Sequence, residues 1–357
     1  MAKIQDLRHK IDLIDDQLLK LINRRGKLAI QIGQEKSKKG SPSHFHVPHR
    51  EREIIDRIKH SNAGPFPGES LEHVFREIFS ATLALEKPLR IGFLGPETTF
   101  SHQAAIKHFG HSAKFIPHTT IESVFRQVEQ GLCDYGVVPV ENSTEGVINL
   151  TLDCFVDSPV LICGEIKSTI ALYLLSKTSD LKKIKTVYSH PQPLGQCRHW
   201  LNQNLPAVKQ VPASSTANAA EMATKRSTSA AIAGKLAADV YQLHLIAENI
   251  QDRVKNFTRF LVIGKDKAKM GKHNRTSLMF SIRDETGSLL KVLHLFARNK
   301  INLTKIESRP LKDRPWEYLF YVDLEGHTQD PLVHKSLESL KKMCLFLRVL
   351  GSYPRKA

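Results

Sequence analysis

The stretch LRHKIDLIDDQLLKLINRRGKLAIQIG (7–33) decides the first part of the fold, because its apolar residues recur at every third or fourth position. This period predicts one long helix over residues 4–38 with a single apolar seam. Arg25 occupies a position of that seam, between Leu21 and Leu28. A guanidinium buried there without a partner is strongly unfavourable, so we expect Arg25 to face an anion.

Two further cations, Lys36 and Arg8, are candidates to share a ligand with Arg25. Lys36 lies three turns further along nearly the same face, about 16 Å away, whereas Arg8 is about 42 Å from Lys36 along one helix. If Arg8 reaches the same ligand, it comes from a second chain, which implies an intertwined dimer. Alternatively, Arg8 and Lys36 are ordinary solvated residues and Arg25 pairs with a glutamate of the core.

Two shorter helices are expected after a break at GSPS (40–43), the first over residues 48–60 and the second ending at Lys87. The apolar face of the last helix carries a hydroxyl and a carboxyl, those of Thr82 and Glu86. Polar groups on such a face indicate either a site or an internal pair.

Beyond residue 88 short apolar runs, such as RIGFLG (90–95), alternate with helical stretches. This alternation predicts an α/β domain with a mostly parallel sheet. A charged linker over residues 265–274 follows. After it, a strand, a turn with glycine, a helix and the strand YLFYVDL (318–324) indicate a small ferredoxin-like βαββαβ unit.

The composition narrows the class of protein. With 357 residues and 41% hydrophobic side chains the chain is globular, and no apolar run is long enough for a membrane span. Its five cysteines are scattered and form no CxxC pair, so we expect a reducing compartment, the cytoplasm, and no structural zinc. The net charge of +16 raises nucleic acid as a partner, but the excess is spread along the chain. We therefore expect neither a nucleic-acid nor a membrane partner.

Longer motifs resemble known families. The stretch 7–33, HREREI (49–54) and the third helix resemble the all-helical chorismate mutase domain. The chain after Pro88 resembles prephenate dehydratase through five motifs in the family's order. They are GPETTFSHQAA (95–105), VVPVENSTEG (137–146), SHPQPLGQC (189–197), SSTANAAEM (214–222) and NFTRF (256–260). Together they indicate the family of bifunctional chorismate mutase–prephenate dehydratases, over nearly the whole chain.

The resemblance implies three domains of different fold class. A three-helix, all-α chorismate mutase domain that forms an intertwined dimer is expected over residues 1–88. An α/β dehydratase domain with two lobes, like a periplasmic binding protein, is expected over residues 89–266. An α+β, ferredoxin-like ACT regulatory domain is expected over residues 275–354.

The resemblance also implies the residues of the mutase site. The rearrangement of chorismate to prephenate is pericyclic, so we expect no cofactor and no metal. The site should hold a dicarboxylate in its reactive conformer and stabilise negative charge on the ether oxygen. The family positions are Arg8, Arg25, Lys36, Val47, Arg50, Glu51, Thr82 and Glu86.

Roles follow from the chemistry of these side chains. Arg25 and the partner chain's Arg8 would clamp the carboxylates, Lys36 would contact the ether oxygen, and Glu51 would accept the ring hydroxyl. The RERE run at residues 50–53 by itself indicates only a charged, exposed turn.

Two of the mutase positions depart from the family's usual residues. Val47 stands where the family often carries Asp, and valine cannot make the hydroxyl contact that the carboxylate would make. Glu86 stands where some members have Gln. A carboxylate would repel the developing oxyanion, so Glu86 is expected to act protonated, with a pKa raised by its apolar surroundings.

For the dehydratase site the resemblance implies hydroxyls, amides and one cation that bind prephenate and assist loss of carbon dioxide and water. They are Thr99, Ser101, Asn142, Ser143, His190, Gln192, Gln196, Ser215, Thr216, Asn256, Thr258 and Arg259. Helix N-termini after Gly- and Ser-rich turns would bind carboxylates.

Four residues of these motifs carry specific expectations. Thr258 is the essential residue of the TRF motif. Its hydroxyl is too weak an acid to ionise, so it would donate a hydrogen bond to the leaving oxygen. Arg259 is the one arginine in place for a carboxylate. His190 is equally well a general base or a structural turn residue. Thr98 stands where the family usually has Gly, a residue suited to positive φ.

The C-terminal segment carries GSLL (287–290) and INLTKIESRP (301–310), which resemble the phenylalanine-binding ACT domain. The implied site consists of Gly287, Ser288, Leu289, Leu290, Glu307, Ser308 and Arg309. Backbone N–H groups of the glycine turn would bind the effector's carboxylate, and Glu307 would meet its ammonium. We expect phenylalanine to inhibit, with ACT domains paired in a homodimer or higher homo-oligomer. An ordinary C-terminal domain without ligand is the alternative.

A different class of function stays open beside the enzyme. An amino-acid-binding regulator with an inactive core would share the same fold. The retained mutase side chains and the TRF motif favour the enzyme, because a sensor has no use for them.

Overall fold

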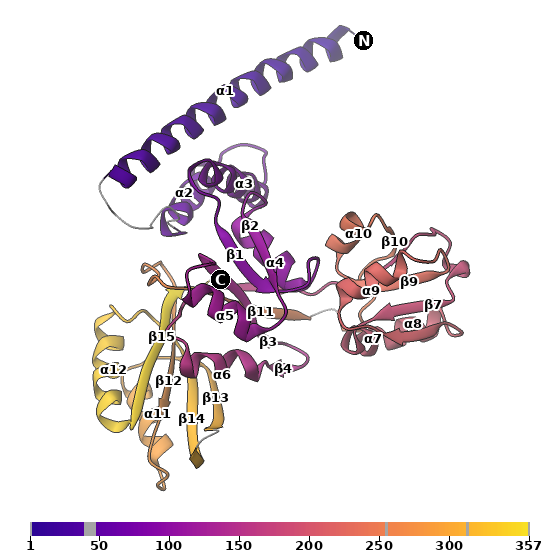
Figure 1. Cartoon of the computed structure of the whole chain (residues 1–357). Helices are drawn as coiled ribbons and strands as arrows, with labels where there is room; N and C mark the ends of the chain where they lie inside the picture. Colours follow the sequence, from indigo (N-terminus) through magenta and orange to yellow (C-terminus); the bar gives the residue numbers. More distant parts are fainter. Residues whose placement is uncertain (1, 39–47, 254–255, 312–313, 356–357) are drawn as a thin grey trace. The chain divides into compact units, whose positions relative to one another are not determined.

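The computed structural model describes residues 2–38, 48–253, 256–311 and 314–355 (Figure 1). The chain divides into two compact units. The first consists of Met1–Arg90 and Ile106–Lys114, and the second of Ile91–Ala105 and Phe115–Ala357. Within the described residues no helix is both long enough and apolar enough to cross a bilayer.

The first unit contains the three helices that the sequence predicts. They are α1 (Ala2–Lys38), α2 (Pro48–Ser61) and α3 (Gly68–Glu86). Both α1 and α2 pack on α3. The apolar seam of α1 is largely exposed within one chain: Ile4, Ile14 and Leu21 are 58%, 54% and 61% exposed.

The first unit also includes residues beyond the expected boundary at residue 88. Arg76 of α3 donates a hydrogen bond to the carbonyl of His108 (3.0 Å), and the Ser112 amide donates to Ser80 Oγ (3.1 Å). Gly110 approaches Ser80 so closely that a Cβ would collide with it, and its φ is +74°. These contacts explain why residues 106–114 group with the helices.

The second unit begins with a mixed sheet in the order β2-β1-β3-β11-β5, with β4 beside β3. Its strands are β1 (Arg90–Leu94), β2 (Lys114–His118), β3 (Tyr135–Asn142), β4 (Gly146–Val147), β5 (Leu161–Thr169) and β11 (Phe257–Gly264). Helices α4 (Phe100–Phe109), α5 (Ile121–Glu129) and α6 (Asn149–Asp157) connect them.

A second sheet forms the other lobe, in the order β10-β6-β9-β7-β8. Its strands are β6 (Tyr173–Ser176), β7 (Thr186–Ser189), β8 (Lys209–Pro212), β9 (Ser229–Ala233) and β10 (His244–Ala247). The 3₁₀ turn η1 (Leu181–Lys183) and helices α7 (Pro191–Gln196), α8 (Arg198–Asn204), α9 (Thr216–Ala223) and α10 (Lys235–Tyr241) complete it.

The two-lobed α/β prediction is confirmed, but the prediction of a mostly parallel sheet is wrong. β11 runs antiparallel to both β3 and β5, and β6 runs antiparallel to β9 and β10. The physical reason is the chain path: it leaves the first sheet after β5, builds the second lobe, and returns as β11. The outgoing and returning segments meet where the Ile170 amide donates to the carbonyl of Asn256 (2.8 Å).

The C-terminal segment has the predicted βαββαβ order. It consists of β12 (Asn274–Ser281), α11 (Ser288–Arg298), β13 (Leu303–Leu311), β14 (Arg314–Glu325), α12 (Pro331–Met343) and β15 (Phe346–Pro354). The strands form an antiparallel sheet in the order β13-β14-β12-β15.

Each face of this C-terminal sheet is buried against a different core. Phe280 and Val322 pack in a core with the helices α11 and α12. Met279 and Tyr321, on the opposite face, pack in one core with Leu261 of β11. The C-terminal sheet therefore shares a hydrophobic core with the first dehydratase sheet.

Candidate functional site

A pocket of about 410 Å³ is lined by residues of both lobes in the second unit. Every predicted dehydratase residue except Ser143 and Arg259 lines it. The polar lining consists of Thr99, Ser101, Thr119, Asn142, His190, Gln192, Gln196, Ser214, Ser215, Thr216, Asn256 and Thr258. None of the described lining residues is a lysine or an arginine, so this part of the pocket binds through hydroxyls, amides and an imidazole.

Thr258 lies on β11 directly opposite Asn142 of β3. The Asn142 side-chain amide donates to Thr258 Oγ1 at 2.8 Å. The orientation of that amide is fixed, because Asn142 Oδ1 accepts hydrogen bonds from the backbone amides of Thr144 (2.9 Å) and Glu145 (3.1 Å). Since Thr258 Oγ1 accepts from Asn142, its own hydroxyl proton remains available for another acceptor.

Asn256 extends this network between the lobes. Its Oδ1 accepts from Asn142 (3.1 Å), and its amide donates to Gln196 Oε1 of α7 (3.1 Å). Ser143 supports the network from beside the pocket, since its Oγ accepts from the Phe257 amide at 3.0 Å. A connected set of side-chain amides therefore surrounds the Thr258 hydroxyl.

Helix starts supply the remaining polar lining. Ser215 caps α9 by accepting from the Asn218 amide (3.0 Å), and Thr216 is the first residue of that helix. Ser101 lies in the first turn of α4. His190 caps α7 through its Nδ1, which accepts from the Gln192 amide at 3.4 Å. His190 therefore has a structural role as the cap of α7, and the same residue also lines the pocket.

The turn before α4 explains the unusual Thr98. Its φ is +66°, in the left-handed region, and its side chain is 1% exposed. The Thr98 amide donates to His102 Nδ1 (3.1 Å), and the His102 ring stacks on Phe93 at 4.5 Å. Burial lowers the pKa of His102, with Glu97 opposing the shift, so the ring stays neutral and accepts this bond. The backbone at this position, where the family usually has glycine, does adopt a positive φ.

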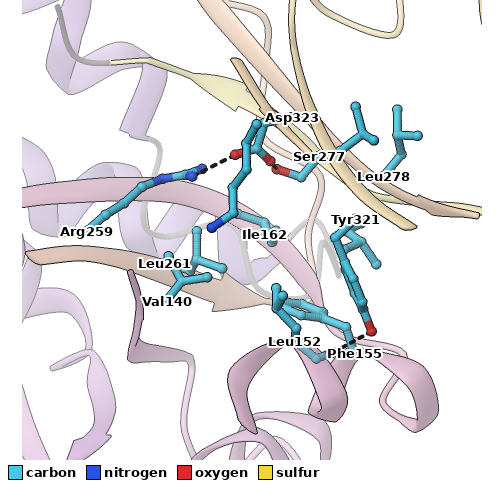
Figure 2. Close-up of a pocket in the computed structure, with 13 residues that line it drawn as sticks. Val140, Leu152, Phe155, Ile162, Arg259, Leu261, Ser277, Leu278, Tyr321 and Asp323 are labelled. Atoms are coloured by element: carbon cyan, nitrogen blue, oxygen red, sulfur yellow. Dashed lines mark hydrogen bonds and ion pairs between the residues drawn. The ribbon is translucent and has the colours of Figure 1, made fainter. Parts of the chain in front are cut away.

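Arg259 does not reach the pocket, which corrects its expected role as a carboxylate ligand there. Thr258 and Arg259 are consecutive on a strand, so their side chains face opposite sides of the sheet. Figure 2 shows Arg259 extending from β11 toward Asp323 of β14. Its guanidinium donates to Glu165 (2.8 Å) and Asp323 (2.6 Å), away from Thr258.

In the first unit, Arg25 lies close to two of the other predicted mutase residues. Its Nη1 donates to Thr82 Oγ1 at 2.6 Å, and its guanidinium lies 4.9 Å from the centre of the Phe79 ring. Burial lowers the pKa of Arg25, and the charge of Glu51 opposes that shift. The hydroxyl of Thr82 also donates to the Ile78 carbonyl, so it presents its oxygen to Arg25.

Glu86 lies on the α1 side of α3. A Cβ on Gly33 would lie 2.9 Å from Glu86 Oε2, so the end of the flexible Glu86 side chain lies against α1 at this glycine. Arg8 is exposed, and Arg50 is exposed beside Glu53 (3.1 Å). The side chain of Lys36 and all of Val47 lie outside the described residues, so their expected roles stay predictions.

The predicted effector residues lie on two elements of the C-terminal segment, the start of α11 and the strand β13. Gly287, with φ +83°, precedes α11, and Ser288, Leu289 and Leu290 form its first turn. Glu307, Ser308 and Arg309 lie on β13, which is at the edge of the sheet. The guanidinium of Arg309 donates to Asp153 of α6, from Nη2 to both carboxylate oxygens (3.0 and 2.9 Å) and from Nε to Oδ1 (3.3 Å).

Sequence reasoning missed some of the site. Thr119 and Ser214 line the pocket, and each follows directly or closely after a strand, which is a signal for binding residues at a sheet edge. A second hollow of about 810 Å³ shares His190 and Asn256 with the pocket. Its charged lining is balanced, with two arginines, Arg198 and Arg253, and two carboxylates, Glu145 and Asp252.

Comparisons with known proteins agree with this geometry. The family model for chorismate mutase type II matches residues 7–87, that for prephenate dehydratase matches 91–268, and that for the ACT domain matches 276–342. The bifunctional chorismate mutase/prephenate dehydratase of Aquifex aeolicus is 49% identical and covers 99% of both chains. The protein of that name from Pseudomonas aeruginosa is 42% identical over 99% of this chain and 98% of its own.

Among solved structures, the prephenate dehydratase of Arthrobacter aurescens in complex with L-Phe is 32% identical. It superposes with a TM-score of 0.70 over 75% of this chain and 90% of its own. The relatives that match this chain over its full length and all three family models give the same assignment. The chain belongs to the family of bifunctional chorismate mutase/prephenate dehydratases.

Proposed function

We propose that the chain rearranges chorismate to prephenate in its helical unit and converts prephenate to phenylpyruvate in the pocket around Thr258. The observation that carries the second half is the 2.8 Å hydrogen bond from Asn142 to Thr258 Oγ1 inside a two-lobed pocket. The family assignment supports both halves, and the pocket supplies the polar groups that the dehydration needs.

The dehydration needs a hydrogen bond to the departing hydroxyl. As the carboxylate leaves as carbon dioxide, its bonding electrons enter the ring, and the bond from the ring to the hydroxyl breaks. Thr258 donates to that oxygen as negative charge develops on it, and the hydroxide is released as water after taking up a proton. Asn142 fixes the Thr258 oxygen so that its proton is directed outward.

The two carboxylates of prephenate are held in this proposal by neutral donors. The starts of α9, at Ser215 and Thr216, and of α4, at Ser101, present N–H groups and hydroxyls with the positive end of the helix dipole. Gln192 and Gln196 of α7 add amide donors.

For the mutase, Arg25 is the central carboxylate ligand. Thr82 accepts a hydrogen bond from one nitrogen of the Arg25 guanidinium, and the Phe79 ring packs against the plane of that group. The guanidinium is therefore oriented before substrate binds. Glu51 holds the ring hydroxyl, Lys36 and protonated Glu86 stabilise the ether oxygen, and Arg50 contributes charge. This is electrostatic positioning of a reactive conformer.

A homodimer is part of the mutase proposal. The seam of α1 exposes Ile4, Leu7, Ile11, Ile14, Leu18, Leu21, Leu28 and Ile32. A stripe of this length on a monomer is costly and fits the same stripe of a second copy. In such a dimer Arg8 reaches the site of the partner, where it grips the second carboxylate.

Complementation tests the shared site. Arg8→Ala and Arg25→Ala chains are each expected to lose mutase activity. In a heterodimer of the two, one site carries both lesions and the other carries neither. Co-refolding equal amounts should therefore restore about a quarter of the wild-type mutase rate. Absence of restoration, with both chains in one dimer, contradicts a site shared between chains.

Regulation by phenylalanine completes the proposal. The ACT family match supports an effector site in the C-terminal segment, with Gly287–Leu290 binding the carboxylate and Glu307, Ser308 and Arg309 contacting the rest. The proposed domains are 1–88, 89–266 and 275–354, and the proposed compartment is the cytoplasm, consistent with five free cysteines.

Purified chain supplied with prephenate tests the dehydratase half, with and without phenylalanine. Phenylpyruvate should form and phenylalanine should slow it, with calorimetry showing that phenylalanine binds. Formation of no phenylpyruvate refutes the enzyme and favours the amino-acid-binding regulator.

A further inference from the structure

Two catalytic strands carry charged residues on the side away from the pocket. Thr258 pairs with Asn142 across β11 and β3, and the adjacent positions, Arg259 and Glu141, also pair. Successive residues of a strand face opposite sides, so the first pair faces the pocket and the second faces away. Thr258 and Asn142 are therefore each bonded through the backbone to a charged residue whose side chain lies on the far face of the sheet.

Arg259 is anchored by three acceptors from three strands. Its Nε donates to Glu165 of β5 (2.8 Å), its Nη1 to Asp323 of β14 (2.6 Å) and its Nη2 to Tyr353 of β15 (3.0 Å). The side chains of Arg259, Glu165 and Asp323 are only 12%, 8% and 9% exposed. Charge-assisted hydrogen bonds between groups so weakly screened are strong and directional.

The cluster is balanced in charge and extends into the C-terminal sheet. Arg275 of β12 also donates to Glu165, and Ser277 donates to the second oxygen of Asp323. Burial alone would lower the pKa of Arg259, but Tyr353, Asp323 and Glu165 outweigh burial and raise it. Arg259 therefore remains a cation at any pH at which the protein folds.

The second strand has one anchor, which is more exposed, since the Glu141 side chain is 39% exposed. Glu141, the neighbour of Asn142, bonds to Lys305 of β13 at 3.1 Å. The ladder between β11 and β3 shifts its register immediately after Arg259. Backbone at such an irregularity is held less firmly by the ladder alone, so the side-chain anchors matter more there.

The space between the two sheets leaves these groups little freedom to move. The cavity lined by Arg259, Lys305, Ser277 and Asp323 measures about 20 Å³, room for one water molecule at most. Figure 2 shows Arg259, Ser277 and Asp323 near apolar lining residues such as Leu261. Because tightly packed interiors transmit strain, a shift of the C-terminal strands here would displace β11.

We propose that Asp323 and Glu165 position Thr258 through Arg259, so that the C-terminal sheet is a working part of the dehydratase site. This inference rests on the proposed function, in which Thr258 donates to the leaving oxygen. Arg259 is a positioning residue in this scheme. Its anchors fix the backbone of β11, and a displacement of about 1 Å at a reacting group is enough to slow catalysis about 100-fold.

The test replaces Asp323 with asparagine in the full-length chain. Asp323→Asn should lower kcat for prephenate by about 10-fold or more, with KM changed less than about threefold, because binding groups elsewhere in the pocket are intact. Glu325→Gln is the matched control. It lies two residues further on β14, bonds to Arg355 at the surface, and should leave both constants unchanged.

The mutase rate of the same sample is the internal standard, because its residues belong to the other unit. Arg259→Lys should fall between the wild type and Arg259→Gln in kcat, since lysine keeps the charge without the fork. If Asp323→Asn does not fold, Ser277→Ala keeps every charge and should lower kcat about two- to fivefold, because it loses one hydrogen bond to Asp323.

Two results overturn the inference: an Asp323→Asn enzyme with wild-type kcat, or one that changes KM alone. If Ser277→Ala is the variant measured, an unchanged kcat overturns it equally. A wild-type chain that forms no phenylpyruvate refutes the proposed function instead, so the two failures are distinguishable.

Discussion

The side-chain amide of Asn142 donates a 2.8 Å hydrogen bond to the hydroxyl oxygen of Thr258, from the directly opposite position of the neighbouring strand. The hydroxyl proton of Thr258 is thereby left for another acceptor. Replacing Thr258 with valine keeps the shape of the side chain and removes that donor. We expect the dehydratase rate to fall about 100- to 1,000-fold, the usual effect of losing one oxyanion donor.

Thr258→Ser is the matched control for this prediction, because it keeps the hydroxyl and should keep most of the rate. Prephenate consumption measures the dehydratase, and chorismate consumption by the same sample should be unchanged. Dehydration by Thr258→Val at the wild-type rate would contradict hydrogen-bond donation by this residue.

Arg25 is predicted to be essential to the mutase through its planar fork. Lysine at this position keeps the charge but cannot hold a carboxylate with two parallel bonds while also donating to Thr82. Arg25→Lys should therefore lower chorismate mutase kcat/KM by about 100-fold, with prephenate dehydration unchanged. Arg24→Lys, on the exposed neighbouring position, is the control and should behave as wild type. Equal mutase rates for the two variants would exclude Arg25 from the site.

Glu86 is predicted to act in its protonated form beside the ether oxygen. Glu86→Gln keeps a donor of similar shape and cannot ionise. The variant should retain mutase activity at neutral pH and extend it to higher pH, where the wild type loses the proton. The measurement is the pH profile of mutase kcat/KM for both proteins. A profile that the substitution leaves unchanged would remove Glu86 from this role.

His102 makes the stability of the turn before α4 depend on pH. Its pKa is lowered in the folded chain by burial, so below the unfolded value near 6.5 the unfolded chain binds more protons. Stability should therefore be full above that pH. It should decline as the pH falls through the window between the two pKa values, by at most about 1.4 kcal/mol per pH unit. Protonation also removes the acceptor that the Thr98 amide uses.

Denaturant unfolding between pH 5 and pH 7.5 measures this effect in the wild type and in His102→Gln. Glutamine offers an oxygen acceptor and does not titrate, so the variant should show the smaller loss of stability at acid pH. Identical pH dependence in the two proteins would mean that His102 does not contribute.

The helical part of the fold was predictable because one strong period sets it. The seam of α1 is regular over the whole helix, and the breaks at Lys87 and before Pro48 are local signals. The packing of residues 106–114 on α3 was not predictable, since it depends on contacts such as His111 with Glu77 between segments far apart in sequence.

The dehydratase site was predictable as a set of motifs, and the structure brings most of their residues into one pocket. One of the two exceptions, Arg259, shows the limit of motif reasoning. A motif says which residues occur together, but strand alternation decides which of two neighbours faces the pocket, and Thr258 and Arg259 cannot both do so. Thr98 shows the converse, because the usual glycine of its position correctly indicated the left-handed φ of +66°.

The fold of the C-terminal segment was predictable from the sequence, but its packing against the dehydratase sheet was not. Its βαββαβ order follows from the sequence, whereas the shared core, with Met279 and Tyr321 packed among dehydratase residues, depends on complementary surfaces. Such a core also means that removing the C-terminal segment would expose apolar residues of the dehydratase sheet. Point substitutions such as Asp323→Asn are therefore the sharper tests.

One measurement tests the central claim most directly: the purified full-length chain is given chorismate alone, and chorismate, prephenate and phenylpyruvate are followed together in time. The account predicts that chorismate is consumed, that prephenate appears first, and that phenylpyruvate then accumulates to match the chorismate lost. Loss of chorismate without phenylpyruvate, or no loss of chorismate at all, would contradict it.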